Sequence, residues 1–394
     1  MSTLTEANRQ TNNETGTPNS AHTMTYARAR LWLGVSCVGF FTTLSAAALW
    51  FGVPAAALST TSVAFGVAAG QLALFVLAYA ALQAPFDLLG GKLFPSRFGR
   101  QHLHGRSFAP VLMRGVSTHA TVLFVSLLVL HYASAIGGVA GVAITSAAIA
   151  ITMLAIRPLL ARIIGGIARV RAQEHAVFSA ADEGFTGGID GVLRPRADMI
   201  PQRWIDDFGE QELAVLAERR SLAVQQGHWL RGRVFSVGFV VAGAVLAALL
   251  TGRDALGTPA GTVTLSLWFT LWSFAGLLTL PTPSRASVHA IEAELRSDDE
   301  TAAALDAALA KVDKLADDEP TRPSAIEAVF HPVPAVSQPN AKNGAHNRRV
   351  TVIPPMWDVA RTSLFLGGAA GGLLGRAVHC NCGRPMLWVY LPSP

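Results

Sequence analysis

Long apolar runs without a charged side chain constrain the fold of this chain more than any other feature. A helix needs about 20 apolar residues to cross the hydrocarbon core of a bilayer. Only 14% of the residues are charged, against about 25% in soluble proteins. The sequence therefore predicts a mainly α-helical, multi-pass transmembrane protein and excludes a soluble enzyme, a disordered chain or a disulfide scaffold. Its six predicted spans are Leu31–Val53, Ala64–Ala84, Gly115–Ala135, Gly137–Ile156, Val234–Leu250 and Val263–Leu280.

The basic residues between these runs predict the orientation of the chain. The loop Pro54–Val63 and the turn Gly137–Gly138 carry no charge. Lysine and arginine are enriched in cytoplasmic loops, and this bias predicts an inner-membrane protein with both termini in the cytoplasm. The net charge of +5 then belongs to the flanks of the spans, so the lipid bilayer rather than nucleic acid is the expected partner. The basic residues that follow the second and fourth spans are Lys92, Arg97, Arg100, Arg106, Arg114, Arg157, Arg162, Arg169 and Arg171.

The spans divide the chain into regions, and each region has its own expected structure. We expect a disordered cytoplasmic N-terminus (1–30) and a four-span region (31–164) with a basic cytoplasmic loop (85–114). A cytoplasmic module (165–232), a two-span hairpin (233–280), a cytoplasmic helical module with a linker (281–350) and a C-terminal tail (351–394) follow. Apolar spacing predicts helices over Arg203–Gln226, Arg285–Arg296 and Asp298–Leu315. The glycine-rich stretch Gly184–Gly191 lacks the ending of a phosphate loop and predicts a turn between short strands.

Four polar residues interrupt the apolar runs or lie at their edges: Gln71, Gln83, His119 and His131. We expect them to hydrogen-bond neighbouring helices near the span ends. No aspartate, glutamate, lysine or arginine lies within the predicted spans, and this disfavours a proton-coupled transporter.

Two short segments on either side of the last predicted hairpin carry a family resemblance. The first, Glu212–Ala217, has the sequence E-L-A-V-L-A; the second, Ser284–Glu292, has the sequence S-R-A-S-V-H-A-I-E. In this order they resemble the integral-membrane zinc metallopeptidases, such as the CaaX-processing and membrane heat-shock proteases. In that family the first helix continues into H-E-x-x-H, and a third ligand, a glutamate, follows the next hairpin.

The metal-binding residues of that family are missing here. The two histidine positions hold Glu218 and Leu222, the general-base position holds Arg219, and the third-ligand position holds Val288. Loss of these ligands removes both the metal and its activated water. The resemblance therefore implies a non-catalytic scaffold or interaction protein, an inactive metallopeptidase-like body with a protein partner and no cofactor. The alternative is a membrane hydrolase with atypical ligands, for which His228 and His289 are the nearby candidates.

The C-terminal tail holds a second candidate site, made of His379, Cys380 and Cys382. These residues could bind zinc in part, with a further ligand from elsewhere, or Cys380 could act as a thiol nucleophile. Arg376 and Arg384 lie nearby in sequence and would favour a thiolate. The competing interpretation is a basic amphipathic tail that Trp388 and Tyr390 anchor at the membrane interface. The apolar stretch Leu364–Leu374 is too short to span and predicts a re-entrant or interfacial helix.

Overall fold

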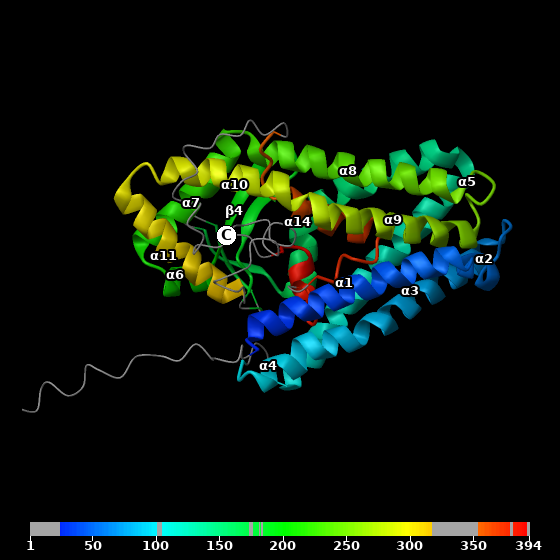
Figure 1. Ribbon diagram of the computed structural model, residues 1–394, viewed down its shortest axis with the longest axis horizontal. Helices are drawn as coiled ribbons and strands as arrows, with labels where there is room; N and C mark the ends of the chain where they lie inside the picture. The colour runs from blue at the N-terminus through cyan, green and yellow to red at the C-terminus, as the bar shows by residue number, and fades with distance from the viewer. Residues whose placement is uncertain are drawn as a thin grey trace, which may run out of the picture.

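The computed structural model describes residues 24–100, 105–172, 176–180, 182, 184–316, 354–378 and 381–391. Five helical segments in this part of the chain are long and apolar enough to cross a membrane. The fold is mainly α-helical, and the prediction of a multi-pass helical membrane protein is confirmed. The long helices that form the bundle in Figure 1 are α1 (Tyr26–Trp50), α3 (Phe65–Leu88), α5 (Gly105–Gly165), α8 (His228–Thr251) and α9 (Pro259–Thr279).

The longest of these helices, α5, is a hairpin. Its backbone leaves the helical region at Gly138, where φ is 54° and ψ is −135°. The two arms lie side by side, and a hydrogen bond of 3.2 Å from the Arg114 Nε to the carbonyl of Ile164 joins their far ends. Only glycine adopts such a positive φ readily. The turn predicted at Gly137–Gly138 therefore lies where expected, and α5 contains two of the six predicted spans.

The short loops between the spans gather at one end of the bundle. There the short helix α2 (Val53–Ala57) follows α1, and the Ser59 carbonyl accepts a bond from the Ala260 backbone nitrogen. The Ser134 hydroxyl accepts a bond from the Gly257 backbone nitrogen, 3.1 Å away. The globular module, formed by elements within residues 168–225 and 281–316, lies at the opposite end (Figure 1). Successive connections thus alternate between the two ends, as the pattern of charged and uncharged loops requires.

The region predicted as a basic loop, residues 85–114, is mostly helical where the structure describes it, except for the turn at Phe98–Arg100. Helix α3 runs into a π-helical turn (Leu89–Leu93) and then into α4 (Phe94–Arg97). Helix α5 begins at Gly105, ten residues ahead of the predicted third span. The apolar residues among these charges lengthen the helices, because they pack against the first helix and the C-terminal residues.

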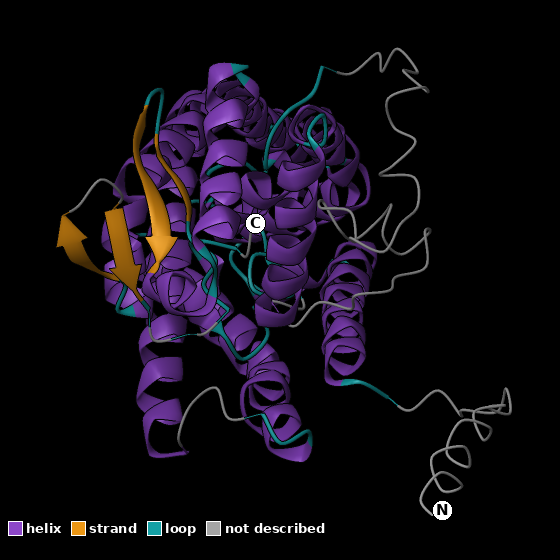
Figure 2. Cartoon of the chain, turned by 90° about the vertical axis from the view of Figure 1, so that its left-hand side faces the viewer, coloured by secondary structure: helices purple, strands orange, loops and turns teal. Residues whose placement is uncertain are grey.

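In the described residues, the globular module combines a small sheet with four helices. Strands β1 (Ala168–Ala172), β2 (Ala176–Ser179), β3 (Gly188–Gly191) and β4 (Pro195–Pro201) form a sheet of order β1-β2-β4-β3. The pairs are antiparallel except for β2 with β4, which is parallel (Figure 2). The stretch Gly184–Gly191, predicted as a turn between short strands, contains strand β3 itself, and the rest of the module was expected to be helical. The helices are α6 (Gln202–Asp207), α7 (Glu210–Gln225), α10 (Pro281–Leu295) and α11 (Asp299–Ala316), and an apolar core joins them.

The C-terminal segment, residues 354–378 and 381–391, lies inside the bundle. It contains α14 (Val359–Ala369) and a 3₁₀ turn (Pro385–Trp388), and helices α5, α8 and α9 pack against α14. Nearly all its residues from Thr362 onward are buried. The expectation of an interfacial anchor is therefore wrong, since Trp388 is 0% exposed and Tyr390 2% exposed. These rings pack against Phe365 and Phe185 rather than at the headgroups. Of the two alternatives for Leu364–Leu374, burial contradicts the interfacial helix and leaves the re-entrant one.

Candidate functional site

The two segments that carry the family resemblance meet in the globular module, where α7 packs against α10. At this contact an Arg219 Nη2 donates a hydrogen bond of 2.7 Å to Oε1 of Glu292. Both side chains are buried, the arginine completely and the glutamate to all but 6%. The guanidinium also lies over the ring of Trp357, 5.4 Å from its centroid. A buried ion pair therefore occupies the point where the two segments touch.

Helix α7 holds this position because its start and its faces are fixed by neighbouring elements. The Glu212 carboxylate accepts a bond of 2.7 Å from the Gly209 backbone nitrogen at the helix start. The same carboxylate pairs with Lys311 of α11 at 2.6 Å. Arg220 bonds Asp198 of β4 at 2.7 Å and the carbonyl of Thr186, also at 2.7 Å. These contacts fix the rotation of α7 and direct Arg219 at α10.

The positions that would hold metal ligands are distributed over different environments. Glu218 is exposed, whereas Leu222 is half-buried and Val288 is buried, both in the apolar core of the module. Arg219, at the general-base position, is a donor with no acceptor atom. Burial lowers the pKa of its guanidinium, and the charge of Glu292 opposes that shift. This set of side chains does not fit a catalytic zinc site, which requires three protein ligands and an open position.

The histidines considered as substitute ligands do not complete a site. His228 lies at the start of α8 with Nδ1 3.1 Å from the Pro355 carbonyl and Nε2 2.9 Å from the Gln226 side-chain oxygen. His289 is exposed on α10. Within the described residues, no three His, Cys, Asp or Glu side chains form a group that could hold a metal ion.

Of the C-terminal candidates, His379 and Cys380 lie outside the described residues, and Cys382 is fully buried. Its thiol faces the carbonyl of Ala377 at 3.3 Å and shares an apolar cluster with Cys37. Cys382 is 0% exposed, so its thiol is not accessible to a substrate in this conformation.

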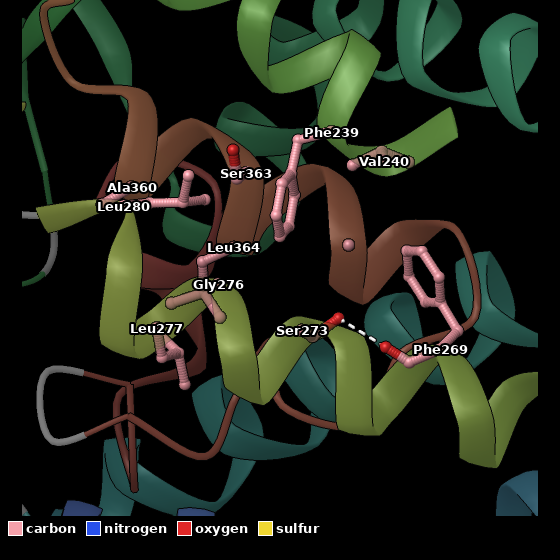
Figure 3. A pocket seen from close by; sticks show the side chains of 11 residues that line it. Phe239, Val240, Phe269, Ser273, Gly276, Leu277, Leu280, Ala360, Ser363 and Leu364 are labelled. Atoms are coloured by element: carbon pink, nitrogen blue, oxygen red, sulfur yellow. Dashed lines mark hydrogen bonds between the residues drawn. The ribbon is translucent and has the colours of Figure 1, made fainter. Parts of the chain in front are cut away.

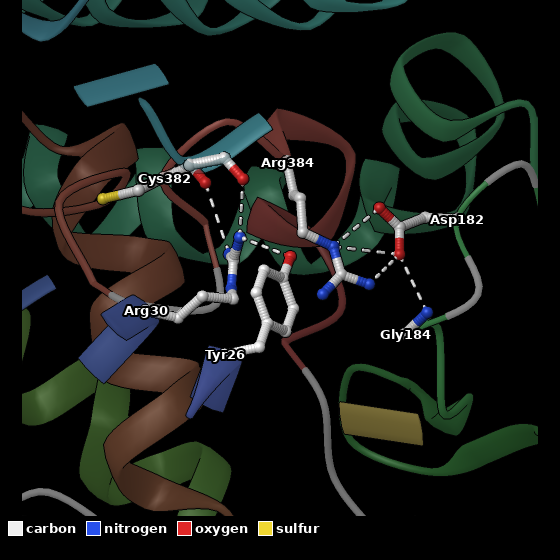
Figure 4. Close-up of polar contacts among 7 residues, drawn as sticks. Tyr26, Arg30, Asp182, Gly184, Cys382 and Arg384 are labelled. Atoms are coloured by element: carbon white, nitrogen blue, oxygen red, sulfur yellow. Dashed lines mark hydrogen bonds and ion pairs between the residues drawn. The ribbon is translucent and has the colours of Figure 1, made fainter. Parts of the chain in front are cut away.

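The arginines expected to activate that thiol bind carboxylates instead. Arg384 Nε lies 2.9 Å from Oδ2 of Asp182, whose other oxygen accepts a bond from the Gly184 backbone nitrogen (Figure 4). Arg376 pairs with Asp87 near the end of α3. Sequence reasoning missed both aspartates, because nothing local in the sequence links them to the tail.

Arg30 of α1 adds a third arginine to this region (Figure 4). It donates to the Gly90 carbonyl at 2.8 Å and to the Cys382 carbonyl at 3.3 Å. Three chain regions far apart in the sequence are thereby joined at the module end of the bundle.

The polar residues predicted near span ends largely behave as expected. His131 Nδ1 lies 3.0 Å from the Thr262 hydroxyl, and Gln71 donates to the Ser59 hydroxyl at 2.8 Å. Gln83 accepts a long bond of 3.5 Å from the Cys37 thiol. His119 differs: its ring packs edge-on against Trp388 of the C-terminal segment, 4.5 Å between centroids.

A small pocket between α8, α9 and α14 offers no catalytic chemistry. Its walls are apolar except for the hydroxyls of Ser273 and Ser363 (Figure 3). The Ser273 hydroxyl donates to the Phe269 carbonyl, and no ionisable side chain lines the walls. A serine without a neighbouring base is a weak nucleophile.

No protein-family model matches this sequence, and no curated protein matches it. Function is therefore inferred from the residues themselves, foremost from the Arg219–Glu292 pair and the buried C-terminal segment.

Proposed function

We propose that this protein is a non-catalytic scaffold or interaction protein of the membrane, built on a body that resembles the integral-membrane zinc metallopeptidases. The observation that carries the proposal is the buried pair of Arg219 and Glu292. It lies at the contact of α7 and α10, the two helices on which the resemblance places the metal ligands. An ion pair there occupies the contact in place of a metal, and Arg219 supplies neither a ligand nor a base for hydrolysis.

The order of elements also supports the resemblance. A small sheet precedes α7, the hairpin of α8 and α9 follows, and α10 returns to α7. The second segment ends at Glu292, and this carboxylate faces α7. The body thus retains the contact between the two segments with different chemistry at its centre.

The same proposal includes location and orientation. The protein resides in the inner membrane, with the globular module and both termini in the cytoplasm. The support is the charge of the connections: the loops without net charge gather at one end of the bundle and the basic ones at the other. Labelling of single cysteines with a membrane-impermeant maleimide in intact cells tests it. Cysteines placed in Pro54–Val63 are expected to react. Reaction of a cysteine placed at Glu218 instead would contradict the proposed orientation.

The sharpest test of the resemblance is to restore the missing ligands. A variant with Glu218→His, Arg219→Glu, Leu222→His and Val288→Glu should bind about one zinc per chain if the positions correspond. The matched control carries Arg219→Glu and Val288→Glu with the two histidines at Ser221 and Leu222, adjacent positions that do not share a helix face. Bound zinc is measured after gel filtration in detergent, and folding is checked by circular dichroism.

Zinc in the restored variant and not in the control would support the proposal. A folded restored variant without zinc would show that α7 and α10 do not correspond to the metallopeptidase helices. If the fourfold variant does not fold, the pair Glu218→His and Leu222→His alone keeps the test open. It should then bind zinc more tightly than wild type, since two histidines at this spacing share a helix face.

A further inference from the structure

The contact between the body (residues 24–316) and the C-terminal segment is charged on both sides. Asp87 and Asp182 of the body are 1% and 3% exposed. Their cationic partners, Arg376 and Arg384, both belong to the segment. A buried carboxylate without a cation is costly. The interior of the body therefore requires a ligand with two positive charges at these points.

The body also reaches toward the main chain of the segment. Arg157 Nε donates to the Val389 carbonyl at 2.8 Å, and its guanidinium lies 4.2 Å from the centroid of the Tyr390 ring. Arg30 donates to the Cys382 carbonyl, and Leu373 donates its backbone nitrogen to Thr270 at 3.1 Å. Contacts to backbone atoms are the means by which proteins hold peptide ligands.

The shape of the interior is adapted to the path of the segment. A Cβ atom on Gly90 or Gly91 would lie within 3.0 Å of the carbonyl groups of Cys382 and Gly383, respectively. Both glycines belong to the π-helical turn that follows α3. Such turns often mark functional sites. This turn lets the segment pass directly against the backbone of the body.

The segment does not satisfy every polar group that surrounds it. Among the described residues, neither ring nitrogen of His119 nor the Tyr79 hydroxyl has a hydrogen-bond partner, although both side chains are buried. On the segment itself, the indole nitrogen of Trp388, which packs against His119, also lacks one. Buried polar groups normally have a partner, and a ligand with a polar atom at this place would supply the missing one.

We propose that the interior of the body is a peptide-binding chamber, and that the chain's own C-terminal segment is its resident, exchangeable ligand. The chamber selects an apolar segment that carries two arginines spaced as Arg376 and Arg384. This inference rests on the proposed scaffold function, because it specifies the chemistry of the partner that the scaffold would bind.

The test uses the full chain with a specific protease site inserted after Asn340 and an affinity tag at the N-terminus. The protein is purified in mild detergent, cleaved and recaptured on the tag. A fluorescent peptide of residues 354–394 is then added under reducing conditions. The peptide is compared with one that carries Arg384→Ala and with a matched control that carries Arg361→Ala. Arg361 lies in the same segment and pairs with Asp358 of that segment, 4.0 Å away.

We expect the cleaved segment to stay bound and the added peptide to replace it over hours. The Arg384→Ala peptide should compete at least about 10-fold less well, whereas the Arg361→Ala peptide should match wild type. A body with Asp182→Arg should prefer the Arg384→Asp peptide over the wild-type one. This reversal separates recognition from misfolding.

A segment that never exchanges, or peptides that compete equally, would overturn the proposal. Tight zinc in the wild-type protein would overturn the scaffold function and leave these exchange results unchanged, so the two failures are distinguishable.

Discussion

Replacement of the Arg219–Glu292 pair by methionines tests the centre of the module most sharply. Arg219→Met leaves a buried carboxylate and Glu292→Met a buried guanidinium, because the two side chains are 0% and 6% exposed. Removal of one partner from a buried pair costs about 3–5 kcal/mol. Loss of the guanidinium over Trp357 adds about 0.5–2 kcal/mol to the first variant.

The double variant should be far less destabilised than either single variant. It leaves no buried charge, and it removes the Nε and Nη1 donors of Arg219, which have no partner among the described residues. Replacement of a buried ion pair by apolar side chains of similar volume is neutral or stabilising by about 1–4 kcal/mol. We therefore expect the module of the double variant to be about as stable as wild type.

Native-state hydrogen exchange of the α7 and α10 amides in detergent measures these differences without global unfolding. The control is the same cycle on Arg203 and Asp207, an exposed pair at 2.9 Å in α6. That pair should couple by at most about 0.5 kcal/mol. A double variant of Arg219 and Glu292 that loses as much stability as the two single variants combined would refute the reasoning.

Two further predictions concern the chamber and α7. Gly91→Val should displace the C-terminal segment, because the new Cβ would meet the Gly383 carbonyl. The displacement is measured as loss of the segment after cleavage and recapture. The control variant Gly70→Val, with open space around the new side chain, should keep the segment bound. Burial would raise the pKa of Glu212, but the Lys311 contacts and the Gly209 bond outweigh it and hold the pKa below its usual value. The carboxylate therefore stabilises α7 above its unfolded pKa, and this contribution is lost as pH falls through the lower folded value. Glu212→Gln should speed exchange of the first-turn amides of α7 at neutral pH, and the difference from wild type should vanish in acid; a difference that persists there would contradict the assignment.

The membrane part of the fold was predictable because each span carries its own signal. A charge-free apolar run has few alternatives to a membrane helix, and Gly137–Gly138 marked the turn of α5. The ends of the helices were less predictable. Helix α8 begins at His228, six residues before its predicted start, because Arg231 and Arg233 continue the helix on the module side. Local hydropathy cannot separate such residues from a loop.

The C-terminal segment was not predictable from its own residues. Its short, glycine-rich helix and its aromatic residues fit an interfacial tail as well as a buried insert. The carboxylates that hold the segment inside the bundle are far away in the sequence. Asp87 lies 289 residues before Arg376, and Asp182 lies 202 residues before Arg384. The sheet as a whole was not predicted, because β1 and β4 hold charged residues and β2 pairs with β4 across the intervening β3. Non-local pairing of this kind leaves little pattern in one sequence.

Zinc content tests the central claim most directly, because the claim is a metallopeptidase-like body without a metal. The protein is purified in detergent without chelator, and zinc per chain is measured by elemental analysis. A variant with Cys380→Ser and Cys382→Ser is measured beside it. We predict far less than one zinc per chain in both samples. About one zinc per chain in both samples would place a metal in the body and contradict the account, whereas zinc lost only in the variant would assign it to the C-terminal cysteines.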